Sequence, residues 1–266
     1  MRREQPRPQP PTAPGAPGAT LRPRRGPEPW MRVAVWLVRP LLLVWTRPRW
    51  RGQEQLQRPG GVVLAVNHTS YADPLVVAHW AWAAGRAPRF LAKAELFALP
   101  VVGRVLRGAG QVPVQRGSAD AALASDAAVE AVRRGECVVV YPEATITSDP
   151  GLWPMAGRSG AARIALRTGA PLVPVAQWGA HELLPPGTAR PRLGRRVEAR
   201  VTAGDPVDLR DLAARVPPGH DPSPAVAREA TERLLDALTA LVATLRPGEQ
   251  PPPRRVDPGA ARGGAA

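Results

Sequence analysis

The chain has 266 residues, enough for one good-sized domain with a substantial core or for two small ones. Its formal net charge is +14, which favours nucleic acid or an anionic lipid surface as a partner. Nucleic-acid-binding proteins interleave aromatic residues with a basic stripe, whereas the tryptophans here gather in an apolar N-terminal segment, so we expect a membrane lipid surface and no nucleic acid.

The two ends of the chain are typical of disordered tails. Residues 1–29 and 247–266 are rich in Pro, Gly, Ala and Arg and lack the apolar residues that a core needs. Arg2 and Arg3 suggest a twin-arginine signal, but no apolar stretch follows them within reach, so we reject that interpretation.

Residues 30–50 form a strongly apolar segment that Arg32, Arg39 and Pro40 interrupt. A spanning helix requires about 20 apolar residues without central charges, and this segment does not meet that requirement. Tryptophans near arginines that can extend toward water suit a segment lying in the membrane interface. We therefore expect a helical, membrane-associating segment here, with a spanning helix and a buried core helix as alternatives, followed by one folded domain over 51–246.

Short β-like runs alternate with helical stretches from residue 61 onward. The expected strands are 61–66, 89–92, 111–114, 137–141, 172–176 and 197–202. The expected helices are 74–84, 96–106 with an interruption at Pro100, 118–134, 160–168 and 224–245. This alternation predicts an α/β fold with a mixed, largely parallel sheet flanked by helices. The single cysteine, Cys137, lies in an apolar run, where a small buried side chain is expected, and it fits a cytoplasmic protein.

The polar segment 67–73 lies between an expected strand and an expected helix, and the carboxyl ends of strands are where sites form in α/β sheets. Histidine is the commonest general base, so His68 is a candidate for that role. Asp73 can accept the Nδ1–H of the imidazole and fix its tautomer. The structural alternative is a helix cap, because Ser70 and Asp73 match a capping box and Pro74 suits the first helical position.

Three further segments carry weaker signals. Tyr141–Thr145 again follows a buried strand, and Glu143 can bind a hydroxyl or lie in a simple turn. Arg116 ends the segment that begins at Gly110, and it can bind a phosphate or be one surface arginine among many. Val173–Val175 alone indicates only a buried strand.

Together, these four segments follow the order and the approximate spacing of the sequence blocks of the glycerolipid acyltransferases, and the chain resembles the 1-acylglycerol-3-phosphate acyltransferase family. The first block, N-H-x-S-x-x-D, is matched by Asn67, His68, Ser70 and Asp73. The other three are matched at 110–116, in part at 141–145, and at 173–175. The resemblance covers roughly residues 55–205.

The resemblance implies direct acyl transfer from acyl-CoA or acyl carrier protein to the hydroxyl of a lysophospholipid, with phosphatidic acid as the product if the acceptor is 1-acylglycerol-3-phosphate. His68 is the implied base and Asp73 orients it, while backbone N–H groups near the start of the following helix stabilise the oxyanion. Substrate-binding roles are implied for Asn67, Ser70, Arg116, Glu143, Thr145 and Arg158. No cofactor is expected, and no metal site is indicated.

The third block departs from the family pattern at two positions. Ala144 stands where the family usually has Gly, and Ile146 stands where it usually has an arginine that helps to hold the acceptor phosphate. Arg158 or Arg163 can replace that arginine, or the acceptor differs. The alternatives are acyl transfer to another lyso-lipid, such as an acylated amino-acid lipid, and a non-catalytic lipid-binding protein of the same fold. The expected location is the cytoplasmic face of the cell membrane, as a peripheral or monotopic protein.

Overall fold

The computed structural model describes residues 29–114, 120–188, 190–217 and 219–252. Most of both expected tails and the candidate Arg116 lie outside these ranges. The strands are β1 Thr46–Arg51, β2 Val62–Val66, β3 Pro88–Lys93, β4 Val112–Val114, β5 Cys137–Val140, β6 Leu172–Trp178 and β7 Val197–Ala203. The helices are α1 Pro29–Trp45, α2 Asp73–Ala83, α3 Ala94–Ala98, α4 Pro100–Gly108, α5 Asp120–Arg133, α6 Gly160–Thr168, α7 Ala180–Leu183, α8 Arg210–Ala213 and α9 Pro224–Thr244, with a 3-10 turn η1 at Gln53–Leu56.

The strands form one sheet in the order β1-β7-β6-β2-β5-β3-β4. Neighbouring strands are parallel except where β7 meets β6, which confirms the expected mixed, largely parallel sheet. The central strand β2 is buried along its whole length because both of its faces are covered. Val63 and Ala65 pack with one helical layer, whereas Leu64 and Val66 pack with the other, as the two-residue period of a strand requires.

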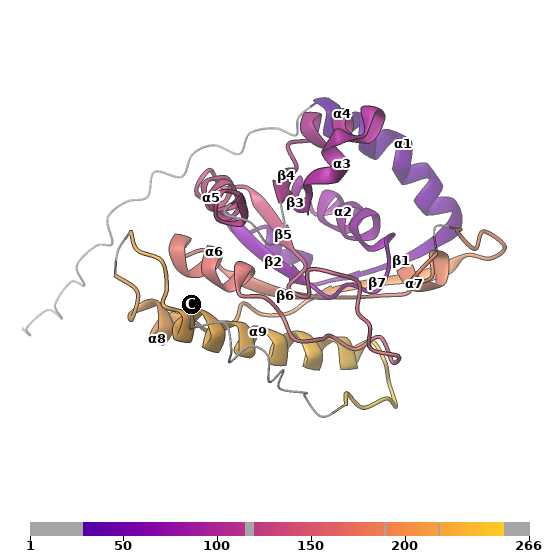
Figure 1. The fold of residues 1–266 in the computed structure, drawn as a ribbon. Coiled ribbons are helices and arrows are strands. Elements are labelled where there is room, and N and C mark those ends of the chain that lie inside the picture. The colour runs from indigo at the N-terminus through magenta and orange to yellow at the C-terminus, as the bar shows by residue number, and fades with distance from the viewer. Residues whose placement is uncertain (1–28, 115–119, 189, 218, 253–266) are drawn as a thin grey trace, which may run out of the picture.

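Two helical layers enclose the sheet (Figure 1). Helices α1, α2, α3 and α4 lie on one face, and α5, α6, α8 and α9 lie on the other. In the first layer Trp80 of α2 is fully buried against the sheet. In the second layer Leu234 of α9 is buried with Ile164 of α6 in the same cluster. Since parallel strands place their carboxyl ends at one edge, the segments that follow β2, β5 and β6 meet there.

The apolar N-terminal segment is a helix only as far as Trp45, so the expectation of a helical segment over residues 30–50 is wrong for its last residues. The hydroxyl of Thr46 donates to the Leu42 carbonyl at 2.6 Å, and Arg196 donates to the carbonyl of Thr46 at 2.9 Å. Residues from Thr46 on then pair with β7 as an edge strand. An edge strand tolerates Pro48, which has no N–H to donate.

Helix α1 presents apolar residues on two faces. The partly or fully covered apolar residues are Val35, Val38, Leu42, Leu43 and Trp45, and the exposed ones are Val33, Trp36, Leu37, Leu41 and Val44. Apart from Leu43, the side chain spacing of three and four residues within each set makes each a stripe along the helix. Among the described residues, none of the helices combines the length and the apolar character that crossing a bilayer demands.

The interruption expected at Pro100 divides the segment 96–106 between two helices, because Pro100 begins a new one. Leu99 has an extended backbone between α3 and α4, which is the conformation that a following proline favours. The remaining helices and strands lie within a few residues of their expected positions. The strand β1 and the short helices α7 and α8 were not expected.

Candidate active site

His68 lies at the carboxyl edge of the sheet, two residues beyond the end of β2. The residue before it, Asn67, fixes the chain to the neighbouring strand β6. The Asn67 amide donates to the Gln177 carbonyl at 3.1 Å and accepts the Gln177 N–H at 2.8 Å. This reciprocal pair continues the sheet pairing for one residue beyond β2 and thereby sets where His68 leaves the sheet.

His68 and Asp73 form a hydrogen-bonded pair, with 2.9 Å between Nδ1 and Oδ2. The same oxygen accepts the backbone N–H groups of Thr69 at 2.6 Å and Ser70 at 2.8 Å. An oxygen that accepts two N–H groups carries no proton of its own, so Nδ1 of His68 is the donor, and in the neutral imidazole the lone pair is then on Nε2. Within the described residues Nε2 has no protein partner, which leaves it for a substrate hydroxyl.

Asp73 is fully buried, with 0% of its surface exposed. Burial raises the pKa of its carboxyl, while the hydrogen bonds from His68, Ser70 and Thr69 oppose that rise because they favour the charged form. The helix-cap alternative does not describe this side chain: Ala72 is the N-cap of α2 and no side chain caps the helix. Asp73 instead faces backward onto the turn that carries His68.

The N–H groups of Thr69 and Ser70 are therefore occupied, and the expectation that N–H groups beside this helix start form the oxyanion hole is wrong for these two. Ser70 also has another role, because its hydroxyl donates to the Leu184 carbonyl at 2.6 Å and accepts the Ala72 N–H at 3.0 Å. It ties the turn to the segment after α7. The substrate contacts predicted for Asn67 and Ser70 stay predictions, since both side chains hold the protein's own backbone here.

Glu143 of the third block and Thr147 just after it hold the backbone of His68 on both sides of its Cα. Oε1 of Glu143 accepts the His68 N–H at 3.0 Å, and the N–H of Thr147 donates to the His68 carbonyl at 2.8 Å. Oε2 of Glu143 accepts the N–H of Met155 at 3.1 Å. The predicted acceptor contact of Glu143 stays a prediction, because both of its oxygens bind backbone groups and the residue is buried.

Burial gives Glu143 an unusual titration. It raises the pKa of this carboxyl to about 7, although the N–H groups of His68 and Met155 lower it by stabilising the charged form. The nearby carboxylate of Asp73 raises it further. Glu143, which accepts the backbone N–H of His68, therefore changes charge close to neutral pH.

Tyr141 covers one face of the His68 imidazole. The two ring centroids are 4.2 Å apart with an interplanar angle of 25°, which is a stacked arrangement. Burial raises the pKa of the Tyr141 phenol well above its usual value, so this group stays neutral. The stack limits the rotation of the imidazole and leaves its ring edge, where Nε2 lies, as the reactive side.

The loop from residue 141 to 155 contains strained backbone. Ala144 has a φ of 57° and Leu152 a φ of 59°, and these are the non-glycine residues of the described chain in the left-handed region. Such conformations cost about 1–3 kcal/mol each and persist only where the surroundings enforce them. The family usually has glycine at the position of Ala144, and this φ gives the physical reason.

The other predicted substrate-binding residues are tied less directly to the site around His68. Thr145 and Arg158 are exposed, and the N–H of Arg158 donates to the Pro142 carbonyl at 2.8 Å, which puts it beside the third block. Arg116 lies outside the described residues. Ile146 is half-buried and uncharged, so it supplies no cation at the position where the family usually has arginine.

Sequence reasoning missed three polar residues of this site. Thr69 accepts a hydrogen bond from the Gln177 amide at 2.8 Å and lies 3.5 Å from the other Asp73 oxygen, and Thr147 holds the His68 carbonyl. A polar residue such as Gln177 in an otherwise apolar buried strand was the available signal. Thr147 gave none, because its neighbours in space come from distant parts of the chain.

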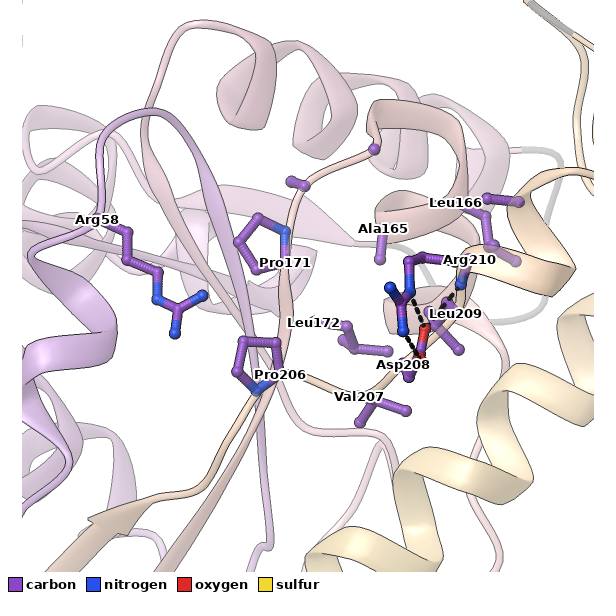
Figure 2. A pocket seen from close by; sticks show the side chains of 13 residues that line it. Arg58, Ala165, Leu166, Pro171, Leu172, Pro206, Val207, Asp208, Leu209 and Arg210 are labelled. Atoms are coloured by element: carbon purple, nitrogen blue, oxygen red, sulfur yellow. Dashed lines mark hydrogen bonds and ion pairs between the residues drawn. The ribbon is translucent and has the colours of Figure 1, made fainter. Parts of the chain in front are cut away.

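A surface pocket of about 530 Å³ lies at the opposite edge of the sheet (Figure 2). Its lining includes Leu172, the first residue of β6, together with Pro206 and Arg58. The guanidinium of Arg210 is paired with Asp208 at 2.6 Å. The pocket holds none of the residues around His68, so it is separate from the candidate active site.

The described residues offer neither a cluster of metal-binding side chains nor an exposed thiol. No three His, Cys, Asp or Glu side chains gather there in a way that would hold a metal ion. Cys137 is buried, and burial raises the pKa of its thiol to about 12. The thiol is thus protonated and packs as a small apolar group, as expected.

Comparison with known proteins agrees with this geometry. The acyltransferase family model matches residues 47–178. The chain is 30% identical to the chloroplastic 1-acyl-sn-glycerol-3-phosphate acyltransferase of Brassica napus over 127 residues, which are 47% of this chain and 35% of that protein. It is 37% identical to the lyso-ornithine lipid O-acyltransferase of Pseudomonas aeruginosa over 112 residues, 41% of this chain and 40% of that protein.

The fold also has a solved counterpart. The crystal structure of the 1-acyl-sn-glycerophosphate (LPA) acyltransferase PlsC from Thermotoga maritima superposes with a TM-score of 0.61 at 21% identity, covering 83% of this chain and 81% of that one. At this identity the likeness shows a shared fold. The chain belongs to the acyltransferase family that includes the 1-acylglycerol-3-phosphate acyltransferases. It spans between a third and a half of the length of the two curated relatives above.

Proposed function

We propose that this protein is a lysolipid O-acyltransferase that moves a fatty acyl group directly from a thioester donor to a free hydroxyl. One observation carries the proposal: the buried carboxylate of Asp73 holds Nδ1 of His68 at 2.9 Å, and Nε2 has no protein partner among the described residues. This is the arrangement of an oriented general base. Membership of the acyltransferase family supports the same chemistry.

The reaction follows from the two ring nitrogens of His68. Nε2 takes the proton of the acceptor hydroxyl as its oxygen attacks the thioester carbonyl of acyl-CoA or acyl carrier protein. The tetrahedral adduct collapses, the C–S bond breaks, and the thiolate takes the proton back from the imidazolium. The products are an ester and a free thiol. Asp73 stabilises the imidazolium between these steps, and a general base of this kind contributes about 10²–10⁴ in rate.

The proposed acceptor is 1-acylglycerol-3-phosphate, giving phosphatidic acid, and a second acceptor class is favoured by a specific observation. Ile146 replaces the arginine that the family places near the acceptor phosphate, so the local positive charge is lower. An acylated amino-acid lipid carries no phosphate and needs no such cation. The 37% identity to a lyso-ornithine lipid O-acyltransferase supports this second class.

Product analysis separates these acceptors. Purified full-length protein in lipid vesicles is incubated with acyl-CoA and, in parallel, with 1-acylglycerol-3-phosphate, larger lysophospholipids and a lyso-amino-acid lipid, and mass spectrometry follows the diacyl products. We expect one acceptor to give product with wild-type protein and none with His68→Ala. Arg158→Gln should raise the KM for a phosphate-bearing acceptor and leave that for a lyso-amino-acid lipid unchanged. Failure of every acceptor would contradict the proposal.

We also propose that the layer of α1–α4 docks on a membrane surface. The outer stripe of α1 is exposed, with Trp36 at 76%, and Val101 of α4 is exposed at 71%. Leu75 of α2 and Leu96 of α3 add exposed apolar surface in the same layer (Figure 1). Exposed apolar patches of this kind mark interaction surfaces. Sequence reasoning found α1 but missed α3 and α4 as parts of it.

The charges of this layer support a lipid partner. Arg32 and Arg39 of α1 and Arg104 and Arg107 of α4 are exposed beside the apolar residues, and Lys93 lies at the start of α3. Basic side chains near an anionic headgroup layer contribute about 1 kcal/mol each. The proposed location is the cytoplasmic face of the cell membrane, where lysolipid acceptors reside and acyl donors are made.

Vesicle flotation tests the docking surface. Trp36→Glu and Val101→Glu should each weaken binding to anionic vesicles by about tenfold or more, because an apolar side chain buried in the bilayer contributes about 1.5–3 kcal/mol. Ala240→Glu is the matched control, since Ala240 is exposed on α9 in the opposite helical layer. Equal binding by all three variants would place the membrane contact elsewhere.

A further inference from the structure

Arg246, one residue beyond the C-cap of α9, is built into the candidate site although it lies outside every sequence block. Only 6% of its surface is exposed. Its guanidinium lies between two indole rings, 4.1 Å from the centroid of Trp153 and 4.3 Å from that of Trp178. Nη1 donates to the Gly151 carbonyl at 2.6 Å, and Nη2 pairs with Glu249. A cation in this position binds the loop through both stacking and hydrogen bonding.

The contacts of Arg246 fall on the two sides of a strained residue. Gly151 and Trp153 flank Leu152, whose φ is 59°. Oδ1 of Asp149 accepts the N–H groups of both flanking residues, at 2.9 Å and 3.2 Å. The turn 149–153 is thus held from inside by Asp149 and from α9 by Arg246. Strained backbone persists only where the surroundings enforce it.

One further contact joins this turn to the base. The hydroxyl of Thr147 donates to the Trp153 carbonyl at 2.8 Å, and the N–H of Thr147 donates to the His68 carbonyl at 2.8 Å. The path from Arg246 to His68 therefore passes through Trp153 and Thr147, and each link is a single contact. An unbroken path of this kind can transmit a displacement of the turn to the peptide of the base.

We propose that Arg246 is a positioning residue for acyl transfer, which fixes the turn 149–153 so that Thr147 holds His68 in its reactive place. The proposal rests on the proposed acyltransferase function. It assigns to the end of α9 a part in the reaction, and it gives the buried guanidinium between Trp153 and Trp178 a purpose beyond packing. Arg246 touches no reacting atom, so its removal should change how fast bound substrates react and not how tightly they bind.

The test compares Arg246→Ala with Arg200→Ala in full-length protein. Arg200 is the matched control, because its guanidinium donates to the carbonyl of Leu245 at 2.8 Å but has no contact with the loop. We expect Arg246→Ala to lower kcat by about 10–100-fold with KM for both substrates changed less than about twofold, since a misplacement of about 1 Å costs up to about 10² in rate. Arg200→Ala should keep the wild-type kcat.

A double-mutant cycle tests the path. Thr147→Val removes the hydroxyl that reaches Trp153, so the double variant with Arg246→Ala should be no slower than the slower single variant. If the losses of kcat in the two single variants multiply in the double variant, the path is wrong. An unchanged kcat in folded Arg246→Ala, or an equal loss of kcat in Arg200→Ala, would overturn the proposal. If Arg246→Ala does not fold, Arg246→Lys replaces it, because lysine keeps the charge and loses the planar fork.

Amide hydrogen exchange gives a readout that needs no activity. The N–H groups of His68 and Thr147 should exchange about tenfold faster or more in Arg246→Ala than in wild type, while the N–H of Leu64 inside β2 keeps its rate. Unchanged exchange at both N–H groups would overturn the proposal. If the wild-type protein has no transferase activity but Arg246→Ala still speeds exchange at these two N–H groups, the proposed function is contradicted and the contact path from Arg246 to His68 is not.

Discussion

The turn of residues 67–73 and the loop of residues 141–155 both follow buried parallel strands, and they meet at the peptide of His68. The catalytic pair is held within the turn, because Oδ2 of Asp73 accepts three donors from it and none of the turn residues has a positive φ. The loop contains both of the strained non-glycine residues in the described chain and depends on contacts from His68 and from Arg246. The reactive groups thus lie in the turn and bind each other locally, and the loop holds the backbone of His68 in place.

The largest effect should come from the turn. Asp73→Asn removes the charge that stabilises the imidazolium and allows the wrong tautomer, so we expect kcat to fall by about 10⁴ with the fold retained. Steady-state kinetics and circular dichroism measure the two properties. Asp205→Asn is the control, because Asp205 bonds Gln55 at 3.1 Å away from the turn. A loss of less than about tenfold would break the distinction between the turn and the loop.

The loop should show its own pH dependence through Glu143. Its pKa is raised to about 7 in the folded protein, above the value of an exposed glutamate, so the folded state holds a proton that the unfolded state has lost. The stability that this proton contributes is complete below about pH 4.5 and is lost as the pH rises through 7. Asp73 changes in the same direction, so the comparison must isolate Glu143.

Denaturant unfolding of wild type and Glu143→Gln measures this contribution. The unfolding free energy of wild type minus that of Glu143→Gln should fall by up to about 3 kcal/mol as the pH rises from about 4.5 to above 7, because only wild type loses the proton of Glu143. A difference that stays constant over this range would show that folding does not raise the pKa of Glu143.

The same substitution sharpens the role of the loop in turnover. A glutamine offers one acceptor oxygen where Glu143 offers two, so either the His68 N–H or the Met155 N–H loses its partner. An unpaired buried donor costs about 1–3 kcal/mol, and we expect kcat to fall by about tenfold with KM unchanged. A change in the acceptor KM alone would favour the substrate contact that the sequence predicted for Glu143.

The smallest effect should come from the strained backbone itself. Ala144→Gly relieves a φ of 57° and should stabilise the protein by about 0.5–1 kcal/mol while leaving kcat within about twofold. Ala214→Gly is the control, because Ala214 is exposed with a φ of −63° and glycine there should destabilise. Thermal unfolding measures both. Equal shifts for the two variants would show that Ala144 carries no strain.

The sequence was enough to predict the catalytic pair because the contact between its two residues is local. His68 and Asp73 lie five residues apart, and the apolar strand before them and Pro74 after them set the geometry. The sheet was predictable for a similar reason, since buried strands are marked by continuous apolar runs. Strand β1 was not, because its partner β7 lies about 150 residues away and its residues are mostly arginine and proline.

The contacts that hold the backbone of His68 were not predictable from sequence either. Glu143 looks the same in the sequence whether it binds a substrate hydroxyl or the N–H of His68, and only the fold decides between them. Arg246 is one of many arginines and reaches Trp153 because α9 runs along one face of the sheet and ends beside the loop. Tertiary packing determines these contacts, and no local sequence pattern predicts them.

Chemical rescue of His68→Gly tests the central claim most directly. Because Glu143 and Thr147 hold the backbone at residue 68, the turn should stay formed and leave a cavity in place of the imidazole. We predict that this variant has almost no acyl transfer and that added imidazole restores it in a saturable manner, without effect on wild type. A wild-type rate in His68→Gly without imidazole would contradict the assignment of His68 as the base.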